Sequence, residues 1–530
     1  MLINARDICF QFPQQEPVFQ HINFSLQAGE KAAIVGHNGA GKSTLLRIIA
    51  GQLSATAGEL QIKDSLYYVP QHYGHYQDHT VAAALGIDHL LTAVDAVEAG
   101  DTSQHLYDLL EHDWDIRSRV AAALANWGLA GLDLQAPMSA LSGGMKTRLF
   151  LSGIDLFTPA IVLLDEPTNH LDRDGRALLY KWLSRTNAAV LLTSHDRQLL
   201  DACDPIWELG AEGIRVYGGN YAFYASMKAA ETSAAAHDLA HHERALKEAK
   251  QKQQLALERK QRSDARAERL GKEGGIPRIL LGGRRMAAEV STGKLKATHG
   301  DKIAGLRSQL EDAAALVEIE RIMKGHFDAP TLPVGKVLVE AEGINFGYPG
   351  GELLWVEPRT VLLRAGDRIA ITGSNGSGKS TLFGIMRGAL PPTVGSIRLT
   401  PVRSLLLDQD YQLIDRSKTV LEQAMDYNER TLEPAWVHTL LANFLFYPAQ
   451  WHQSCASLSG GEMLRLALCC MVLQSKAPDV IFLDEPTNNL DLVNITMLEQ
   501  IFAAYKGTLV VVSHDARFLE RMRVSSEINM

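Results

Sequence analysis

The chain contains two diverged copies of one sequence module, and this duplication constrains its fold more than any other feature. Residues 35–44 and 372–381 read VGHNGAGKST and TGSNGSGKST. Four further landmarks recur in the same order in each half: a glutamine after an apolar run, an LSGG tetrapeptide, an LDEPTN segment and an SHD tripeptide. Landmarks that repeat in one order indicate a true internal repeat of one folding unit.

Length and composition are those of a globular protein with two or three domains. A chain of 530 residues is too long for one hydrophobic core. No apolar run approaches the roughly 18 residues of a membrane helix, and the N-terminus lacks the build of a signal peptide. The five cysteines form no CxxC pair, which favours reduced thiols and a cytoplasmic protein. The net charge of −9 excludes a uniformly basic nucleic-acid binder, but not a local basic surface.

Short apolar runs predict the fold class of each copy. KAAIVG, IVLLDE and AVLLTSH in the first copy, and RIAITG, VIFLDE and TLVVVSH in the second, are rich in Val, Ile and Leu. Such runs suit strands buried on both faces of a parallel sheet, with functional loops at their C-terminal ends. Helical patterns follow the glycine loops directly. Each copy is therefore predicted to be an α/β nucleotide-binding module.

Both glycine loops match the pattern G-x-x-x-x-G-K-[ST], which binds phosphates. The glycines let backbone N–H groups surround the phosphates, and the following helix N-terminus adds partial positive charge. Lys42 and Lys379 are predicted to reach the β- and γ-phosphates, and Ser43 and Ser380 to ligate Mg²⁺. The predicted phosphate-binding residues are Gly36, Asn38, Gly39, Gly41, Lys42, Ser43 and Thr44, and Gly373, Asn375, Gly376, Gly378, Lys379, Ser380 and Thr381.

Carboxylates at two strand ends are the candidates for metal binding and catalysis. Asp165 and Asp484 are predicted to hold Mg²⁺ through water, and the adjacent Glu166 and Glu485 to polarise the attacking water. The competing interpretation of an Asp-Glu pair at this place is helix capping. The catalytic set is completed by histidines from the SHD segments, and glutamines at matched positions could contact the metal or water. These are His195, His514, Gln71 and Gln409.

One aromatic residue precedes each glycine loop at the same position. Phe12 and Tyr348 could stack on the adenine base of ATP. An aromatic at this position can equally be a packing residue, so both interpretations stand.

Taken with these motifs, the LSGG segments make both halves resemble ATP-binding cassette (ABC) ATPases. In that superfamily the signature residues of one module close over the ATP bound by the other. The resemblance implies two composite sites: Lys42, Asp165 and Glu166 with the second signature, and Lys379, Asp484 and Glu485 with the first. The signature residues are Ser142, Gly143 and Gly144, and Ser459, Gly460 and Gly461. Asp172 and Asp491 would lie on loops between the modules, and both sites are predicted to hydrolyse ATP.

The segment between the copies predicts a basic helical hairpin. One long helix is expected from about residue 226 to 269, GKEGGIP breaks it, and a second is expected from about 286 to 323. Between His242 and Lys302 there are 16 Lys or Arg against 8 Asp or Glu. The bend, IPRILLGGRR, combines Arg278, Arg284 and Arg285 with apolar residues, which suits docking on structured RNA. The alternative is a solvated charged linker.

Tandem cassettes joined by such a linker resemble the ABC-F family of ribosome-associated translation factors and antibiotic-resistance proteins. The resemblance implies a soluble, monomeric ATPase that binds the ribosome when closed on ATP. The linker would reach rRNA and P-site tRNA near the peptidyl-transferase region, and hydrolysis would release the protein. The predicted domains are residues 1–225, 226–335 and 336–530. The alternative function is an ATPase subunit of a transporter that recruits separate membrane proteins.

The first module is longer than the second. Lys42 and Ser142 are 100 residues apart, whereas Lys379 and Ser459 are 80 apart. The difference predicts a small insertion at about 85–116. Between His72 and Ile116 there are nine Asp or Glu and no Lys or Arg. Such a surface would be repelled by rRNA, so it is either a contact for a basic ribosomal protein or a solvated acidic surface.

Overall fold

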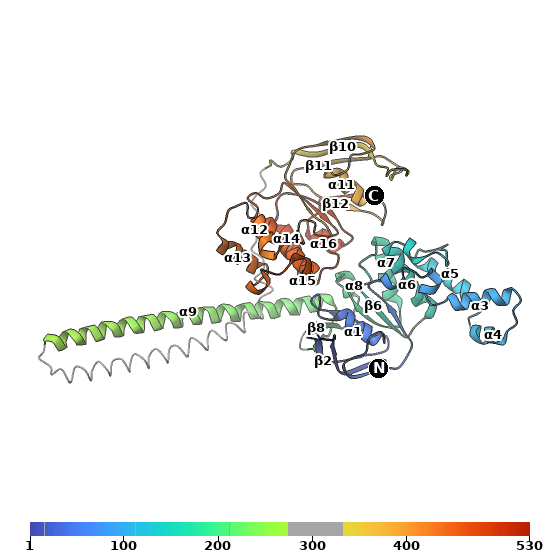
Figure 1. Cartoon of the computed structure of the whole chain (residues 1–530), viewed down its shortest axis with the longest axis horizontal. Helices are drawn as coiled ribbons and strands as arrows, with labels where there is room; N and C mark the ends of the chain where they lie inside the picture. The colour runs from blue at the N-terminus through green and yellow to red at the C-terminus, as the bar shows by residue number, and fades with distance from the viewer. Residues whose placement is uncertain (15, 112, 211–212, 274–331) are drawn as a thin grey trace. The chain divides into compact units, whose positions relative to one another are not determined.

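The computed structural model describes residues 1–14, 16–111, 113–210, 213–273 and 332–530 (Figure 1). The chain forms two compact units. One contains both repeats, Met1–Tyr224 and Gly325–Met530, and the other is Ala225–Lys324. Each repeat folds as the α/β module predicted from its sequence, with one mainly parallel sheet and one antiparallel sheet. The two modules are called the first and second cassette below.

The first cassette is built around a six-stranded sheet of order β5-β6-β7-β3-β8-β9. All neighbouring strands are parallel except β8 and β9. The strands are β3 (Lys31–Val35), β5 (Leu66–Val69), β6 (Ile161–Asp165), β7 (Ala189–Thr193), β8 (Ile206–Gly210) and β9 (Gly213–Tyr217). β6 and β7 are buried along their whole length. Continuous apolar runs form these strands because both faces of the sheet are covered.

Alternate residues of the central strands enter two different cores. Val162 and Leu164 of β6 pack with the helices on one face. Ile161 and Leu163 pack with the antiparallel sheet and α1 (Lys42–Ile49) on the other. The antiparallel sheet has the order β2-β1-β4, from β1 (Ile3–Gln11), β2 (Pro17–Leu26) and β4 (Ala57–Ile62). The glycine loop between β3 and α1 is thus anchored by both layers.

Most remaining helices of the first cassette lie between β5 and β7 in the sequence. They are η1 (Gly74–Tyr76), α2 (Val81–Ala84), α3 (Asp88–Glu98), α4 (Gln104–Leu110), α5 (Ile116–Asn126), η2 (Met138–Ala140), α6 (Gly143–Phe157) and α7 (Arg173–Arg185); α8 (Arg197–Asp201) follows β7. The antiparallel pair α3 and α4 falls in the acidic segment between β5 and α6 (Figure 1). Tyr107 and Trp114 of this segment are exposed and contact each other.

The second cassette repeats this plan. Its parallel sheet has the order β14-β15-β16-β12-β17, and its antiparallel sheet the order β11-β10-β13. The strands are β10 (Val337–Asn345), β11 (Arg359–Arg364), β12 (Arg368–Thr372), β13 (Val394–Leu399), β14 (Ser404–Leu407), β15 (Val480–Asp484), β16 (Thr508–Val512) and β17 (Ser526–Asn529). The helices are α11 (Lys379–Met386), α12 (Val420–Asp426), α13 (Pro434–Asn443), η3 (Pro448–Gln450), η4 (Cys455–Ser457), α14 (Gly460–Leu473), α15 (Leu492–Ala504) and α16 (Ala516–Arg521).

The segment between the cassettes begins with α9 (Tyr221–Glu273), a helix of 53 residues. Its sequence is rich in Ala, Gln, Glu, Lys and Arg, which favour helix, and it has little apolar periodicity. The predicted bend with Arg278, Arg284 and Arg285, and the predicted second helix, lie outside the described residues. Among the described residues, none of the helices has the length and apolar character needed to cross a membrane.

Candidate functional site

The two glycine loops have the same geometry. Gly41 and Gly378 immediately precede α1 and α11 and take left-handed φ values of 92° and 91°. A Cβ at Gly378 would lie 2.7 Å from the Trp355 indole nitrogen, so the loop has no room for a side chain there. Lys42 Nζ donates hydrogen bonds to the carbonyls of Gly36 (2.8 Å) and His37 (3.1 Å). Lys379 makes the equivalent pair of bonds, each of 3.0 Å.

The first metal-site candidate, Asp165, is held by three hydroxyl groups. Asp165 Oδ1 accepts hydrogen bonds from Ser43 Oγ (2.9 Å) and Thr193 Oγ1 (2.7 Å). Asp165 Oδ2 accepts one from the Tyr68 hydroxyl (3.2 Å). Burial raises the pKa of Asp165, and the hydrogen bonds from Thr193, Ser43 and Tyr68 oppose that shift. Ser43 and Asp165, both predicted metal ligands, are therefore direct neighbours.

The second metal-site candidate, Asp484, has a different setting. Strand pairing places Val512 opposite Asp484, where Thr193 is opposite Asp165. Leu406 takes the place of Tyr68 in the same way. Burial is again the main cause that raises the pKa of Asp484, and nearby Asp408 adds to it. The two sites are alike in their carboxylates, but not in the side chains that hold them.

Each proposed catalytic glutamate is buried beside a histidine. Glu166 Oε1 lies 3.1 Å from His195 Nε2, and Glu485 Oε1 lies 3.3 Å from His514 Nε2. Both glutamates take left-handed backbone conformations, with φ of 47° and 45°. Strained backbone of this kind is concentrated at functional sites. Glu166 Oε2 is a buried atom without a hydrogen-bond partner in the described part of the chain.

The pKa values in these pairs are strongly shifted. Burial raises the pKa of Glu166 to about 8, opposed by Lys42. Burial also raises the pKa of Glu485 to about 7, opposed by Arg176 and Lys379. Burial lowers the pKa of both histidines, that of His514 to about 4, where Lys379 and Arg176 add to the shift. The histidines are consequently neutral near pH 7 and able to accept or donate a hydrogen bond.

The signature serines cap the helices that follow them. Ser142 Oγ accepts a hydrogen bond from Met145 N–H (3.3 Å), the first-turn contact of an N-cap. Ser459 forms a full capping box, because its Oγ accepts a hydrogen bond from Glu462 N–H (3.4 Å) while its own N–H donates to Glu462 Oε2 (2.9 Å). The sequence difference between Met145 and Glu462 therefore changes how firmly each signature serine is held.

The first signature and the second glycine loop line one cavity of about 630 Å³. It brings together residues that are more than 200 positions apart in the sequence. The predicted site residues that line it are Ser142, Gly143, Gly144, Tyr348, Asn375, Gly376, Gly378, Lys379, Ser380, Thr381, Gln409, Asp484, Glu485 and His514. This is the composite arrangement predicted for the second ATP site.

The loops that carry Asp172 and Asp491 link each cassette to the glycine loop of the other. Asp172 Oδ1 caps α7 through Gly175 N–H (3.0 Å), while its Oδ2 accepts from Asn375 N–H (3.4 Å). Asp491 Oδ2 accepts from Asn38 N–H at 3.2 Å in the same way. Both aspartates are therefore N-caps of a helix in their own cassette and also contact the opposite glycine loop.

The contacts of the predicted adenine-stacking residues and of Gln71 do not assign them a role. Phe12 is 37% exposed and packs edge-on against Phe10. Tyr348 is 54% exposed, and its hydroxyl lies 3.0 Å from Thr381 Oγ1 inside the cavity. Gln71 lies two residues after the end of β5 and is partly buried. Adenine stacking and metal contact by these residues stay predictions.

Sequence reasoning missed several residues around the sites. Tyr68 and Thr193 donate hydrogen bonds to Asp165. The positive charge of Arg176, in the first cassette, opposes the rise in the pKa of Glu485 that burial causes. Tyr68 lies three residues before Gln71 and Thr193 two residues before His195, so comparing the two repeats at these offsets would have identified both. Arg176 offers no comparable signal, because its role depends on how the two cassettes meet.

The fold and site together define a twin-cassette nucleotide-binding protein. A family model described as ABC transporter matches residues 19–169 and 357–488. The chain is 32% identical over 535 residues to the putative ATP-binding protein YdiF of Bacillus subtilis (strain 168), covering 96% of this chain and 77% of that protein. It is 31% identical to the tylosin resistance ATP-binding protein TlrC of Streptomyces fradiae, covering 95% and 93% of the two chains.

A third relative is the ribosome protection protein VmlR of Bacillus subtilis (strain 168), which is 29% identical and covers 98% of this chain and 85% of its own. The solved structure of an RNase-L inhibitor has a TM-score of 0.56 at 18% identity, covering 98% of this chain and 86% of that one. That likeness supports the tandem-cassette fold. The chain belongs to the ABC-F proteins of the ATP-binding cassette family, and it is an ATP-binding ATPase.

Proposed function

We propose that this protein is an ATP-driven switch that acts on the ribosome. The observation that carries the proposal is the composite cavity, in which the signature of one cassette meets the glycine loop of the other. Closure around ATP then requires both cassettes, which makes ATP a clamp between them. Two relatives, a ribosome protection protein and a tylosin resistance protein, support the ribosome as the target.

The proposed domains are residues 1–225, 226–335 and 336–530, with the middle domain as the part that reaches into the ribosome. Between His242 and Lys302 the segment carries 16 basic against 8 acidic residues in a protein whose net charge is −9. Basic side chains supply affinity for phosphate backbones. The linker would act near the tRNA and peptidyl-transferase region, modulating translation or protecting it from antibiotics.

The nucleotide sites fit a Mg²⁺–ATP substrate. Ser43 Oγ and the Asp165 carboxylate lie 2.9 Å apart, and this hydroxyl–carboxylate oxygen pair suits a hard divalent cation. Bound Mg²⁺ would neutralise phosphate charge as the γ-phosphoryl group transfers. Ser43, Ser380, Asp165, Asp484, Gln71 and Gln409 are the proposed ligands, direct or through water.

The chain's own groups supply the remaining chemistry. Lys42 and Lys379 bind the β- and γ-phosphates, and Glu166 and Glu485 orient the attacking water and accept its proton. His195 and His514, neutral near pH 7, contact the γ-phosphate. Ser142 and Ser459, at the N-termini of α6 and α14, donate to the γ-phosphate of the opposite site.

The switch works if ATP binds the closed form more tightly than the open form. ATP binding would then favour the closed form that binds the ribosome. Loss of the γ-phosphate after hydrolysis removes contacts from both cassettes and lets them separate, as in other nucleotide switches.

The test uses the full chain with Glu166→Gln and Glu485→Gln. This double variant should bind ATP, hydrolyse it slowly and co-sediment with ribosomes only when ATP is present, less so at higher salt. The matched control, Glu59→Gln with Glu357→Gln, changes two exposed glutamates and should behave like the unmodified protein. If the catalytic variant stays at the top of the gradient, or sediments with membrane vesicles instead, the ribosome proposal is wrong.

A further inference from the structure

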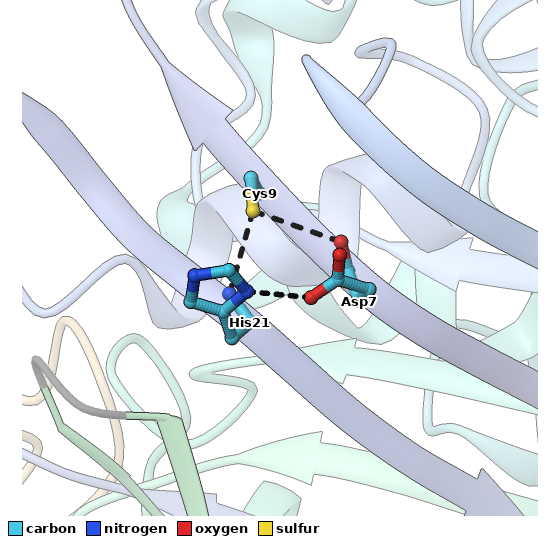
Figure 2. A group of neighbouring side chains, drawn as sticks. All are labelled: Asp7, Cys9 and His21. Atoms are coloured by element: carbon cyan, nitrogen blue, oxygen red, sulfur yellow. Dashed lines mark hydrogen bonds and ion pairs between the residues drawn. The ribbon is translucent and has the colours of Figure 1, made fainter.

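A cluster of three unlike metal-binding side chains lies on the antiparallel sheet of the first cassette. Asp7 and Cys9 belong to β1 and His21 to β2, and their side chains converge (Figure 2). His21 Nδ1 lies 2.6 Å from Asp7 Oδ1. The carboxylate, thiol and imidazole donor atoms all lie within 4.8 Å of one another. None of the three side chains belongs to the nucleotide sites described above.

The backbone holds the cluster in place. Asp7 and His21 both take left-handed conformations, with φ of 54° and 55°, which cost free energy for residues other than glycine. Asn23 ties the two together, because its side-chain oxygen accepts from Asp7 N–H (2.9 Å) and its amide donates to the His21 carbonyl (2.8 Å). Cys9 Sγ accepts from His21 N–H at 3.4 Å. These hydrogen bonds hold the backbone that carries the three metal-binding side chains in place before any metal ion binds.

The second cassette repeats the left-handed backbone at only one of these positions and has none of the three metal-binding side chains. Strand pairing aligns Ile8 opposite Ile22 with Ile344 opposite Arg359, which matches Asp7 to Gly343, Cys9 to Asn345 and His21 to Pro358. Gly343 takes the same left-handed conformation, with φ of 56°. Pro358, at the position of His21, cannot take this conformation because its ring fixes φ at about −65°. The fold therefore repeats the left-handed backbone of Asp7, whereas the left-handed backbone of His21 and the three metal-binding side chains are particular to the first cassette.

Cys9 is also accessible in a way that the other cysteines are not. Cys203, Cys455, Cys469 and Cys470 are buried, whereas Cys9 is partly exposed. The side chains of His21 and Asp7 are 72% and 64% exposed. A thiolate, an imidazole and a carboxylate form a ligand set for a borderline-soft divalent cation such as Zn²⁺, not for Mg²⁺ or Ca²⁺.

We propose that Asp7, Cys9 and His21 form a Zn²⁺-class metal site with water in the fourth position. Binding releases the Cys9 thiol proton to solvent, and the metal bonds to Sγ, to His21 Nδ1 and to Asp7 Oδ1 in place of the present His21–Asp7 hydrogen bond. The ion would join β1 to β2 at their two left-handed residues. It would act on the sheet whose strand β1 carries Phe10 and ends directly before Phe12.

Cobalt provides a direct test with the full-length protein. After chelator treatment, Co²⁺ titration in Mg²⁺-free buffer with a phosphine reductant should produce a thiolate-to-cobalt charge-transfer band and intense visible bands typical of four-coordinate Co²⁺. The bands should saturate at about one equivalent, as expected for a single three-donor site. Added Zn²⁺ should abolish them, and added Mg²⁺ should not.

Conservative variants then assign the ligands. Cys9→Ser should remove the charge-transfer band, and Asp7→Asn and His21→Asn should weaken Co²⁺ affinity by about tenfold or more. Asparagine tolerates left-handed backbone, so both variants should fold. Asp64→Asn, an exposed carboxylate outside the cluster, should leave the spectrum and affinity unchanged. ATP turnover should be the same in all four variants. A missing band, or one that persists in Cys9→Ser, overturns the proposal.

Discussion

The two sides of the cassette interface are built from matching helices, yet among the residues that the structure describes a buried ion pair joins the two cassettes on one side only. Arg197 of α8 donates to Glu499 of α15 at 2.6 Å, and both side chains are at least nine-tenths buried. At the matching positions of the other side stand Ala516 of α16 and Tyr180 of α7, which line a cavity of about 780 Å³. The two cassettes therefore supply equivalent helices to both sides of the interface, but the side chains pack more tightly on the side of Arg197 and Glu499.

This difference has a consequence for the switch segments. Arg197 follows His195 by two residues, so the ion pair fixes the segment that carries the first-site histidine. Ala516 follows His514 in the same way, but His514 borders both the second ATP cavity and the open cavity beside Ala516. We expect the segment carrying His514 to move more easily than the segment carrying His195.

Breaking the buried ion pair should have the largest effect. Arg197→Ala leaves Glu499 buried without its partner and should lower the free energy of unfolding by about 3 kcal/mol. Urea denaturation of the full chain measures this change. A double-mutant cycle with Glu499→Gln should show strong coupling, and simple additivity of the two substitutions would contradict the assignment.

The signature glycines offer a second comparison. A Cβ at Gly144 would lie 2.8 Å from the backbone oxygen of His170 and 3.1 Å from Asn375 of the opposite cassette. At Gly461 the nearest atoms belong to the Asn494 side chain, within the same cassette. In a Glu166→Gln background, which leaves the second site active, Gly144→Ala should therefore lower ATP turnover by about 100-fold through misplacement of that site. In a Glu485→Gln background, which leaves the first site active, Gly461→Ala should lower it by less. Equal losses in the steady-state rate would show that contact between the cassettes does not matter here.

The hydroxyl groups around Asp165 lead to a smaller effect. Thr193→Val installs the residue found opposite Asp484 and removes one hydrogen bond to a buried carboxylate, worth about 1.5–3 kcal/mol. Glu485→Gln is added so that only the first site turns over ATP. In this background, we expect Thr193→Val to raise the Mg²⁺ concentration for half-maximal turnover by about tenfold. Val512→Thr in a Glu166→Gln background is the reciprocal control. An unchanged Mg²⁺ dependence in Thr193→Val would show that the hydroxyl does not position Asp165.

The smallest effect is expected at the second ion pair between the cassettes. Arg517 contacts Asp201, but its side chain is 40% exposed. Solvent screening limits such pairs to about 1 kcal/mol or less. Arg517→Ala should barely change the urea midpoint that Arg197→Ala shifts strongly. A comparable shift would mean that burial does not explain the difference between the two pairs.

Much of this molecule could be predicted from its sequence because the decisive signals are local. The glycine loops, the Asp-Glu pairs and the signature segments each occupy a few consecutive residues, and their duplication indicated two equivalent modules. The long helix α9 was also expected from composition, with bounds that differ by a few residues.

What the sequence did not reveal depends on side chains that meet through tertiary structure. Arg197 and Glu499 are 302 positions apart, and nothing near either residue indicates its partner. Tyr68 reaches Asp165 only because β5 and β6 pair in one register. Asp7 and His21 converge because both take left-handed conformations, which no local pattern in β1 or β2 indicates.

The paired contacts of Asp172 and Asp491 have a thermodynamic consequence. Each carboxylate caps a helix of its own cassette and accepts a hydrogen bond from the other cassette's glycine loop. A nucleotide that tightens one glycine loop therefore acts, through this carboxylate, on a helix of the opposite cassette. Linkage then requires reciprocity: if occupancy of the first site multiplies ATP affinity at the second by some factor, occupancy of the second multiplies affinity at the first by the same factor.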